Sequence, residues 1–269
     1  MIPIRFRAFR FHLPALLLAT ILGACTTVPE TGRQQLLLIS ASEEMQLGLT
    51  EFEKLKKDTP ISKDAAATAL VRKVGQRIAA VAPLPNAQWE FVLFDQPKTP
   101  NAFCLPGGKV GIYSGILPIT LDETGLATVI GHEVAHAVAR HGGERVSQGL
   151  LLQLGGQALS AATRSQPAAT QNLILGAYGI GAQVGIMLPH SREQELEADR
   201  IGLIYMARAG YDPREAVGFW ERFKAYNEKN GGGKNLAFLS THPLDDVRIA
   251  RIRALLPQAV AEYQKAGGR

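Results

Sequence analysis

Two histidines and a glutamate lie within five consecutive residues near the middle of the 269-residue chain, in the sequence HEVAH. On a helix, His132 and His136 are four positions apart and share one face. Two imidazoles that converge in this way bind one zinc ion, and Glu133 beside them reaches a water molecule without binding the ion. The spacing therefore predicts two zinc ligands and a general base for attack of water on a carbonyl group.

The alternative is a chance match to this pattern in a helix of the hydrophobic core. The residues around the motif are apolar, and a buried glutamate is costly without a partner, which favours the metal site. His141 is a further histidine, five residues past His136. It does not complete the metzincin pattern, because Ala139 and Gly142 stand where that pattern needs a glycine and a histidine.

A catalytic zinc ion needs a third protein ligand, and the acidic segment EQELEAD is the best candidate to supply it. Glu195 and Asp199 lie one turn apart on one face of the expected helix, so Glu195 can bind zinc while Asp199 orients a ligand histidine. Glu197 is a rival ligand, but it points to another face. Without HEVAH, a solvent-exposed acidic helix would be the simplest interpretation of this segment.

The motifs HEVAH and ELEAD together resemble the gluzincin zinc metalloproteases of the HtpX and CAAX prenyl protease family, and most of all the periplasmic lipoprotein branch with LoiP and BepA. The resemblance covers most of the chain and implies one Zn²⁺ bound by His132, His136 and Glu195, with Glu133 as catalytic base. We expect no counterpart of the helical-repeat domain of BepA-like proteins after the last helical pattern.

Two further motifs enter through this resemblance. In STHPLDDVRI, His242 and Arg248 occupy positions that lie beside the metal in the family, which implies a role in stabilising the oxyanion. By itself, His242 before a proline would be interpreted as a structural residue at a helix start. In NAFCLPGG, Asn101 and Ala102 match a strand that borders the cleft and binds extended peptides, so with Arg248 they are candidate substrate-binding residues.

The first 24 residues have the pattern of a secretory signal peptide, with three arginines in the first ten positions and an apolar run that ends at Cys25. The sequence LGAC is typical of bacterial lipoproteins, so we expect lipidation of Cys25 and a tether over residues 25–40. The resemblance then implies a periplasmic protein held by lipid at the outer membrane, where contact with the outer-membrane assembly machinery is possible.

Composition limits the remaining function classes. Without residues 1–24 the chain keeps 26 basic and 24 acidic residues, a formal charge of +2, so we expect no nucleic acid partner. The hydrophobic fraction of 46% is typical of a globular domain. If Cys25 is lipidated, Cys104 has no intrachain disulfide partner, and a small buried hydrophobic role is the simplest interpretation.

Helical spacing dominates the rest of the chain and predicts an α+β, predominantly helical domain over residues 41–269. The resemblance implies that this is a zincin-like domain with a small β-sheet bordering the active-site cleft. Residues 149–188 are rich in glycine, alanine and glutamine, which leaves open a packed helical hairpin or a lid. We expect helices at 40–57, 64–82, 123–141, 191–210, 212–229 and 241–260, a strand at 87–95 and two strands within 101–117.

These features predict a zinc endopeptidase, tethered by lipid, that cleaves unfolded or misassembled periplasmic and outer-membrane proteins. A non-proteolytic chaperone or assembly scaffold with a latent metal site is the alternative, although it would not require Glu133. A metal-dependent hydrolase of peptidoglycan or lipid is a third possibility, which the expected peptide-binding strand disfavours.

Overall fold

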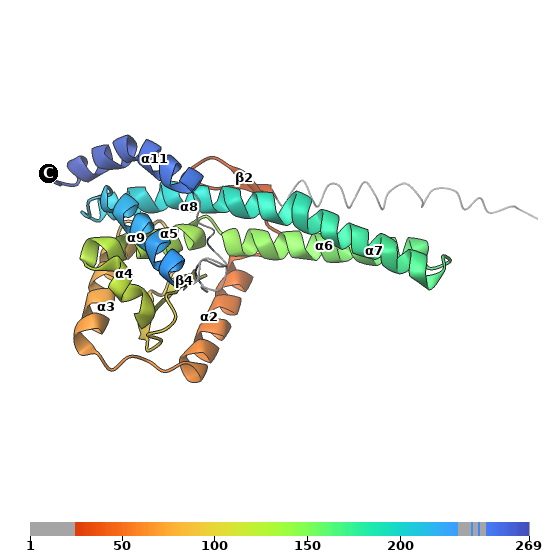
Figure 1. Cartoon of the computed structure of the whole chain (residues 1–269), viewed down its shortest axis with the longest axis horizontal. Helices are drawn as coiled ribbons and strands as arrows, with labels where there is room; N and C mark the ends of the chain where they lie inside the picture. Colours follow the sequence, from red (N-terminus) through yellow and green to blue (C-terminus); the bar gives the residue numbers. More distant parts are fainter. Residues whose placement is uncertain (1–24, 231–237, 239–241, 243–245, 269) are drawn as a thin grey trace, which may run out of the picture.

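The computed structural model describes residues 25–230, 238, 242 and 246–268 (Figure 1). The predicted signal peptide, and all but the first residue of the glycine-rich loop NGGGKN at 230–235, lie outside the described residues. The elements are β1 (Cys25–Thr27), β2 (Gln34–Leu36), α2 (Ala41–Asp58), α3 (Ala65–Ala79), β3 (Glu90–Phe94), β4 (Ala102–Leu105), β5 (Lys109–Tyr113), η1 (Ser114–Ile116), α4 (Leu117–Thr120), α5 (Glu123–Val138), α6 (His141–Thr163), α7 (Ala168–Ala182), η2 (Gln183–Met187), α8 (Leu188–Arg208), α9 (Glu215–Lys229) and α11 (Asp246–Lys265). The predicted α+β, predominantly helical class is confirmed.

Side-chain caps begin three of the helices where the sequence predicts a start. Ser40 accepts a hydrogen bond from the amide of Glu43, and the Glu43 carboxylate accepts one from the amide of Ser40, which forms a capping box before α2. Asp64 caps α3, and Asp122 accepts two amide hydrogen bonds at the start of α5. Each cap satisfies amides that have no partner within the helix.

A three-stranded sheet in the order β3-β5-β4 lies against α5 and α3. Strands β3 and β5 are parallel, whereas β4 and β5 form an antiparallel hairpin with Ala102 opposite Ile112. The hairpin turn uses Gly107 and Gly108, both with positive φ, a conformation that glycine adopts without strain. As an edge strand, β4 has one side without a strand partner among the described residues.

Helices α5 and α8 pack along each other through the centre of the domain, with α11 on the far side of α8 (Figure 1). Their closest approach is at two glycines. A Cβ atom added to Gly202 of α8 would lie 2.8 Å from the backbone nitrogen of His132, and one added to Gly131 would lie 2.9 Å from the carbonyl oxygen of Gly202. Only glycine allows this approach, which brings the HEVAH helix against the ELEAD helix.

Helix α5 ends at Val138, three residues before the end of the helix that the spacing predicts. The reason is Arg140, which takes a left-handed conformation with φ of 57° and breaks the helical run. Its guanidinium donates hydrogen bonds to the buried carboxylate of Glu44 on α2 and to the carbonyl of Ile39. A new helix, α6, therefore starts at His141 and leaves in another direction.

Residues 25–36 form a β-hairpin of β1 and β2 that packs onto the domain, whereas the sequence predicts a tether over 25–40. Val28 is fully buried in the main core, and the Tyr205 hydroxyl of α8 donates a hydrogen bond to Glu30. A flexible tether would make neither contact. Cys25 is exposed at the start of β1, and its lipidation stays a prediction.

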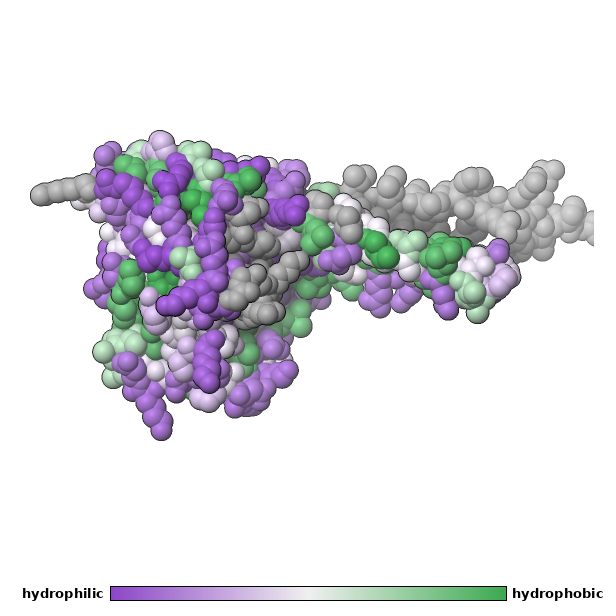
Figure 2. Space-filling view, in the orientation of Figure 1, coloured by the Kyte–Doolittle hydropathy of each residue, from purple (hydrophilic) through white to green (hydrophobic). Residues whose placement is uncertain are grey.

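Helices α6 and α7 form a hairpin that projects from the domain, which we call the arm (residues 149–188; Figure 1). None of the α7 residues, all of them described, is buried. Residues 146–191 carry a single Asp, Glu, Lys or Arg residue, Arg164, and hydrophobic side chains are visible along the arm in Figure 2. The arm is thus a helical hairpin, and it extends away from the body of the domain instead of covering it. Within the described part of the chain, no helix has the length and hydrophobicity to span a bilayer.

Candidate metal centre

Four buried side chains from three separate parts of the chain converge on one point. They are His132 and His136 from α5, Glu195 from α8 and His242, and one donor atom of each lies within 4.8 Å of the others. His132 Nε2 is 3.1 Å from His136 Nε2 and 3.3 Å from Glu195 Oε2. His242 Nδ1 is 3.2 Å from His132 Nε2 and 3.0 Å from Glu195 Oε2.

These distances fit a tetrahedral metal ion. Zinc binds nitrogen and oxygen donors at about 2.0–2.1 Å, so the donors of a tetrahedral site lie about 3.3 Å apart. Imidazoles and one carboxylate also form a donor set that suits zinc among the common ions. The residues present therefore fit a zinc ion, with His132, His136 and Glu195 in the positions that the sequence predicts for ligands.

The ionisation of the cluster follows from burial and charge. Burial lowers the pKa of His136 well below its usual value. Burial raises the pKa of Glu195, but the neighbouring histidines outweigh this and hold it well below its usual range. Burial also lowers the pKa of His132, yet the carboxylates of Asp199 and Glu195 outweigh burial and raise it to about 9. A charged carboxylate buried beside histidines favours the binding of a cation at this site.

His242 lies beside the ligand histidines, where the resemblance implies it, and its role in stabilising the oxyanion stays a prediction. Its Nδ1 atom is one of the four converging donors, and its Nε2 atom is 3.4 Å from Glu133 Oε1. The ring packs against Phe238 and stands next to both ligand imidazoles. In this structure His242 therefore occupies the fourth corner of the donor cluster.

Glu133, the expected base, is buried beside the cluster with its Oε1 atom lacking a hydrogen bond among the described residues. Burial raises the pKa of its carboxyl group, which makes the carboxylate a better proton acceptor. The pKa of the Cys104 thiol on β4 is raised by burial and by the charge of Glu133. Cys104 packs against the core, in agreement with the hydrophobic role predicted for it.

Asp199 lies where a residue that orients a ligand histidine must be. Its Oδ1 atom is 3.0 Å from His132 Nδ1, on the opposite side of the ring from the donor cluster. Burial raises the pKa of Asp199, but Arg248 outweighs this and lowers it. A carboxylate in this position fixes the ring orientation and leaves Nε2 to face the metal.

Arg248 is buried behind the cluster, whereas the resemblance implies contact with substrate. Its guanidinium donates two hydrogen bonds of 2.7 Å to Asp199, lies 3.1 Å from Glu195 Oε2 and stacks on the ring of Trp220 at 3.9 Å. With only 3% of its surface exposed, Arg248 supports Asp199 and Glu195 from within the core. Trp220 had no signal in the sequence beyond helical spacing on α9.

A second set of polar side chains stands behind His136. His141 is fully buried, with Nδ1 2.8 Å from His136 Nδ1 and Nε2 2.9 Å from Glu197 Oε2. Glu197, the rival ligand, thus points away from the donor cluster. Burial raises the pKa of Glu197, but hydrogen bonds from His141, Thr31 and Arg33 outweigh this and lower it to about 2. Nothing in the sequence pointed to Arg33.

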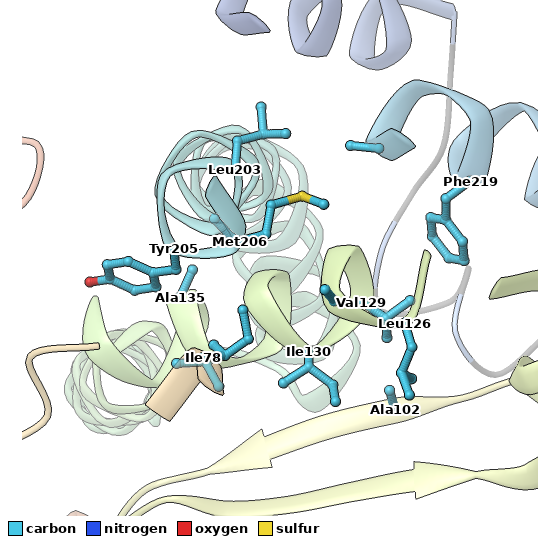
Figure 3. Packing of buried hydrophobic residues seen from close by; sticks show 14 of the residues in the cluster. Ile78, Ala102, Leu126, Val129, Ile130, Ala135, Leu203, Tyr205, Met206 and Phe219 are labelled. Atoms are coloured by element: carbon cyan, nitrogen blue, oxygen red, sulfur yellow. The ribbon is translucent and has the colours of Figure 1, made fainter. Parts of the chain in front are cut away.

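The two expected substrate-binding residues on the edge strand differ in their placement. Ala102 is 2% exposed and points from β4 toward Leu126 of α5, so its side chain belongs to the core (Figure 3). Only its backbone remains for contact with a peptide. Asn101 is half-buried just before β4, and its carbonyl accepts a hydrogen bond from Tyr113.

Comparison with known proteins identifies relatives over most of the chain. Residues 65–256 match the profile of Peptidase family M48. The mitochondrial metalloendopeptidase OMA1 of Saccharomyces cerevisiae is 40% identical over 68% of this chain and 51% of its own length, and that of Schizosaccharomyces pombe is 41% identical over 71% and 54%. The β-barrel assembly-enhancing protease of Escherichia coli is 26% identical over 92% of this chain and 53% of its own length. The chain thus spans about half the length of these curated relatives.

The relatives also correct the predicted location. Five relatives between 32% and 41% identical carry mitochondrial names, whereas the bacterial β-barrel assembly-enhancing protease is more distant. The prediction of a location at the periplasmic outer membrane was therefore wrong, because it depended on the leader sequence and on likeness to bacterial lipoproteins. The predicted family, in contrast, is confirmed by the profile and by the relatives alike: the chain belongs to peptidase family M48.

Proposed function

We propose that this protein is a zinc-dependent endopeptidase. The observation that carries the proposal is the cluster of His132, His136 and Glu195, with Glu133 buried beside it and its Oε1 atom without a hydrogen bond among the residues that the structure describes. The two imidazoles and the Glu195 carboxylate would hold the ion, and the Glu133 carboxylate next to them would accept the proton of the attacking water. Membership of a peptidase family and relatives named metalloendopeptidases support the same chemistry.

The side chains of this chain divide the work of peptide hydrolysis. Zinc, when bound, supplies a Lewis acid that polarises the carbonyl group and acidifies water. Glu133 accepts the proton from the attacking water and returns it to the leaving amine. Asp199 keeps His132 in the orientation and tautomer that present Nε2 to the metal. His242 Nδ1 lies among the same donors and its Nε2 atom lies 3.4 Å from Glu133 Oε1, so this ring would stand beside both the ion and the base when zinc is bound.

We propose unfolded or misassembled protein chains as the substrates. An edge strand such as β4, which runs past α5, can pair with an extended peptide through its backbone. The arm adds a surface with one charged residue, Arg164, and with exposed leucines such as Leu154 and Leu173, to which apolar side chains of an unfolded protein can bind. Both features favour flexible chains over folded proteins.

The decisive experiment compares the protein with its Glu133→Gln variant on unfolded casein, with zinc content measured for both. Glutamine keeps the size of the side chain but cannot accept the proton, so we expect cleavage to fall by about 10²–10⁴-fold with zinc retained. Glu123→Gln, at the start of the same helix and outside the site, is the matched control and should cleave normally.

A chaperone or scaffold with a latent site would behave differently. It would show no cleavage of casein by the unaltered protein, and Glu133→Gln would leave its effect on protein aggregation unchanged. Zinc binding without cleavage of any unfolded protein would therefore contradict the endopeptidase proposal.

A further inference from the structure

The ligand His136 is the first member of a continuous chain of polar contacts that ends in the N-terminal β-hairpin. His136 Nδ1 faces His141 Nδ1 at 2.8 Å, and His141 Nε2 faces Glu197 at 2.9 Å. Glu197 in turn accepts hydrogen bonds from Arg33 Nε at 2.7 Å and from the Thr31 hydroxyl. The last two residues belong to the segment between β1 and β2, more than 160 positions before Glu197.

Only one arrangement of protons satisfies all of these contacts when His136 binds a metal through Nε2. Its proton must then be on Nδ1, where it is donated to the lone pair of His141 Nδ1. His141 consequently carries its own proton on Nε2 and donates it to the Glu197 carboxylate. The hydrogen bonds therefore run in one direction through two neutral imidazoles, from His136 to His141 and from His141 to the Glu197 carboxylate.

We propose that His141 is a positioning residue for the metal ligand His136, and that Arg33 and Thr31 of the N-terminal hairpin hold it in place through Glu197. This inference rests on the proposed function, because it takes His136 as a ligand. His141 contributes no donor atom to the four-residue cluster, and it contacts the Nδ1 side of the His136 ring, away from the converging donors.

The geometry on this side of the site mirrors that around the other ligand. His132 Nδ1 is held by Asp199, which is held by Arg248; His136 Nδ1 is held by His141, then Glu197, then an arginine. Each ligand imidazole is thus fixed by hydrogen bonds that end in an ion pair with arginine. Metal ligands depend on such outer contacts for orientation and basicity.

Arg33 is well anchored for this role. Besides Glu197, it binds Glu144 of α6 through two hydrogen bonds of 2.9 Å, and Glu144 also accepts one from Gln194. The Arg33 side chain is 21% exposed and the two glutamates are almost fully buried. Arg33 therefore joins the N-terminal hairpin, α6 and α8 at the base of the arm, and residues 25–36 become part of the support of the metal site.

Zinc affinity, measured by competition with a chromogenic chelator, tests the proposal without any need for turnover. We expect His141→Leu, which fills the space but forms no hydrogen bond, to bind zinc about 10–100-fold more weakly. His141→Gln keeps an acceptor for His136 and a donor for Glu197, so it should recover most of the affinity. Arg33→Met should weaken binding by roughly tenfold. Arg222→Met is the matched control, because Arg222 has similar exposure and an ion pair with Glu215 on α9, and should bind zinc normally.

The outcomes separate this proposal from the proposed function. If the unaltered protein binds no zinc, the endopeptidase proposal fails and this inference fails with it. If the unaltered protein binds zinc and both His141 variants and Arg33→Met bind it equally well, only the positioning role is overturned. The melting temperature of the metal-free variants is measured alongside. If His141 has a merely structural role, zinc affinity should fall in proportion to the melting temperature of each variant, and His141→Gln and His141→Leu should bind zinc equally well. If His141→Leu fails to fold, the zinc affinity of Arg33→Met compared with that of Arg222→Met decides whether the positioning role holds.

Discussion

Replacing Gly202 by alanine should separate the two helices that carry the metal ligands. The added Cβ would lie 2.8 Å from the backbone nitrogen of His132 and 2.9 Å from the carbonyl carbon of Gly131. Ordinary contacts are 3.4 Å or longer, so the backbones would have to move apart by about 0.6 Å. Backbone atoms cannot rotate away as a side chain can, so α5 and α8 must shift as units.

The energetic effect of this substitution is the difference of two terms. Alanine in a helix gains about 1 kcal/mol over glycine. Overpacking a tight contact costs about 1–3 kcal/mol, so Gly202→Ala should be neutral or destabilising by up to about 2 kcal/mol. The control is Gly176→Ala on α7, where an added Cβ meets no atom within 4 Å. That variant should show only the gain, about 2–4 °C in melting temperature for a domain of this size.

Calorimetry and zinc titration on both variants provide the test. We expect Gly202→Ala to melt below Gly176→Ala and to bind zinc more weakly, because a displacement at Gly202 moves His132 relative to Glu195 and Asp199. The reasoning is refuted if Gly202→Ala gains as much stability as Gly176→Ala and keeps its zinc affinity. That result would mean that the helix contact has room for a methyl group.

Two further expectations concern the arm and the effect of pH. If the arm binds unfolded substrates, Leu154→Gln combined with Leu173→Gln should raise KM for casein but not for a short peptide. Leu47→Gln on α2, where Leu47 is about as exposed as Leu154, should change neither; equal kinetics on casein for all variants would contradict this role. Burial raises the pKa of Glu144, but Arg33 and Gln194 outweigh it and lower the value. A carboxyl group whose pKa is lower in the folded than in the unfolded protein stabilises the fold at pH values above its unfolded pKa. This stabilisation is lost as the pH falls through the folded pKa. Glu144→Gln should therefore lower the melting temperature of the metal-free protein at about pH 7, with a difference that shrinks toward about pH 3; an equal difference at both pH values would contradict this.

Much of the site was predictable because it depends on local spacing. Four positions on a helix place His132 and His136 on one face, and the same spacing places Glu195 and Asp199 on another helix. Helix starts followed from their caps, and the β4–β5 hairpin followed from its glycines. The pairing of the two helices came from the need for a third zinc ligand and from the family resemblance, not from either spacing.

Other features depend on contacts that no local pattern contains. His141 follows the HEVAH helix directly in the sequence, but the left-handed conformation of Arg140 moves it onto a new helix and places it behind His136. The predicted tether is a hairpin whose Arg33 binds Glu144 and Glu197. The sequence shows the charges of these residues but not which of them meet.

By itself, then, the sequence determined the types of chemically active residue, the helices that carry them and the family to which the chain belongs. Only the tertiary structure decided how these helices meet, which placed His242 at the fourth corner of the donor cluster and Arg248 behind Asp199. The physical reason is range. Backbone geometry relates residues a few positions apart. The distance between the two halves of the site depends instead on Gly131 and Gly202, whose lack of a side chain lets the two helices approach closely.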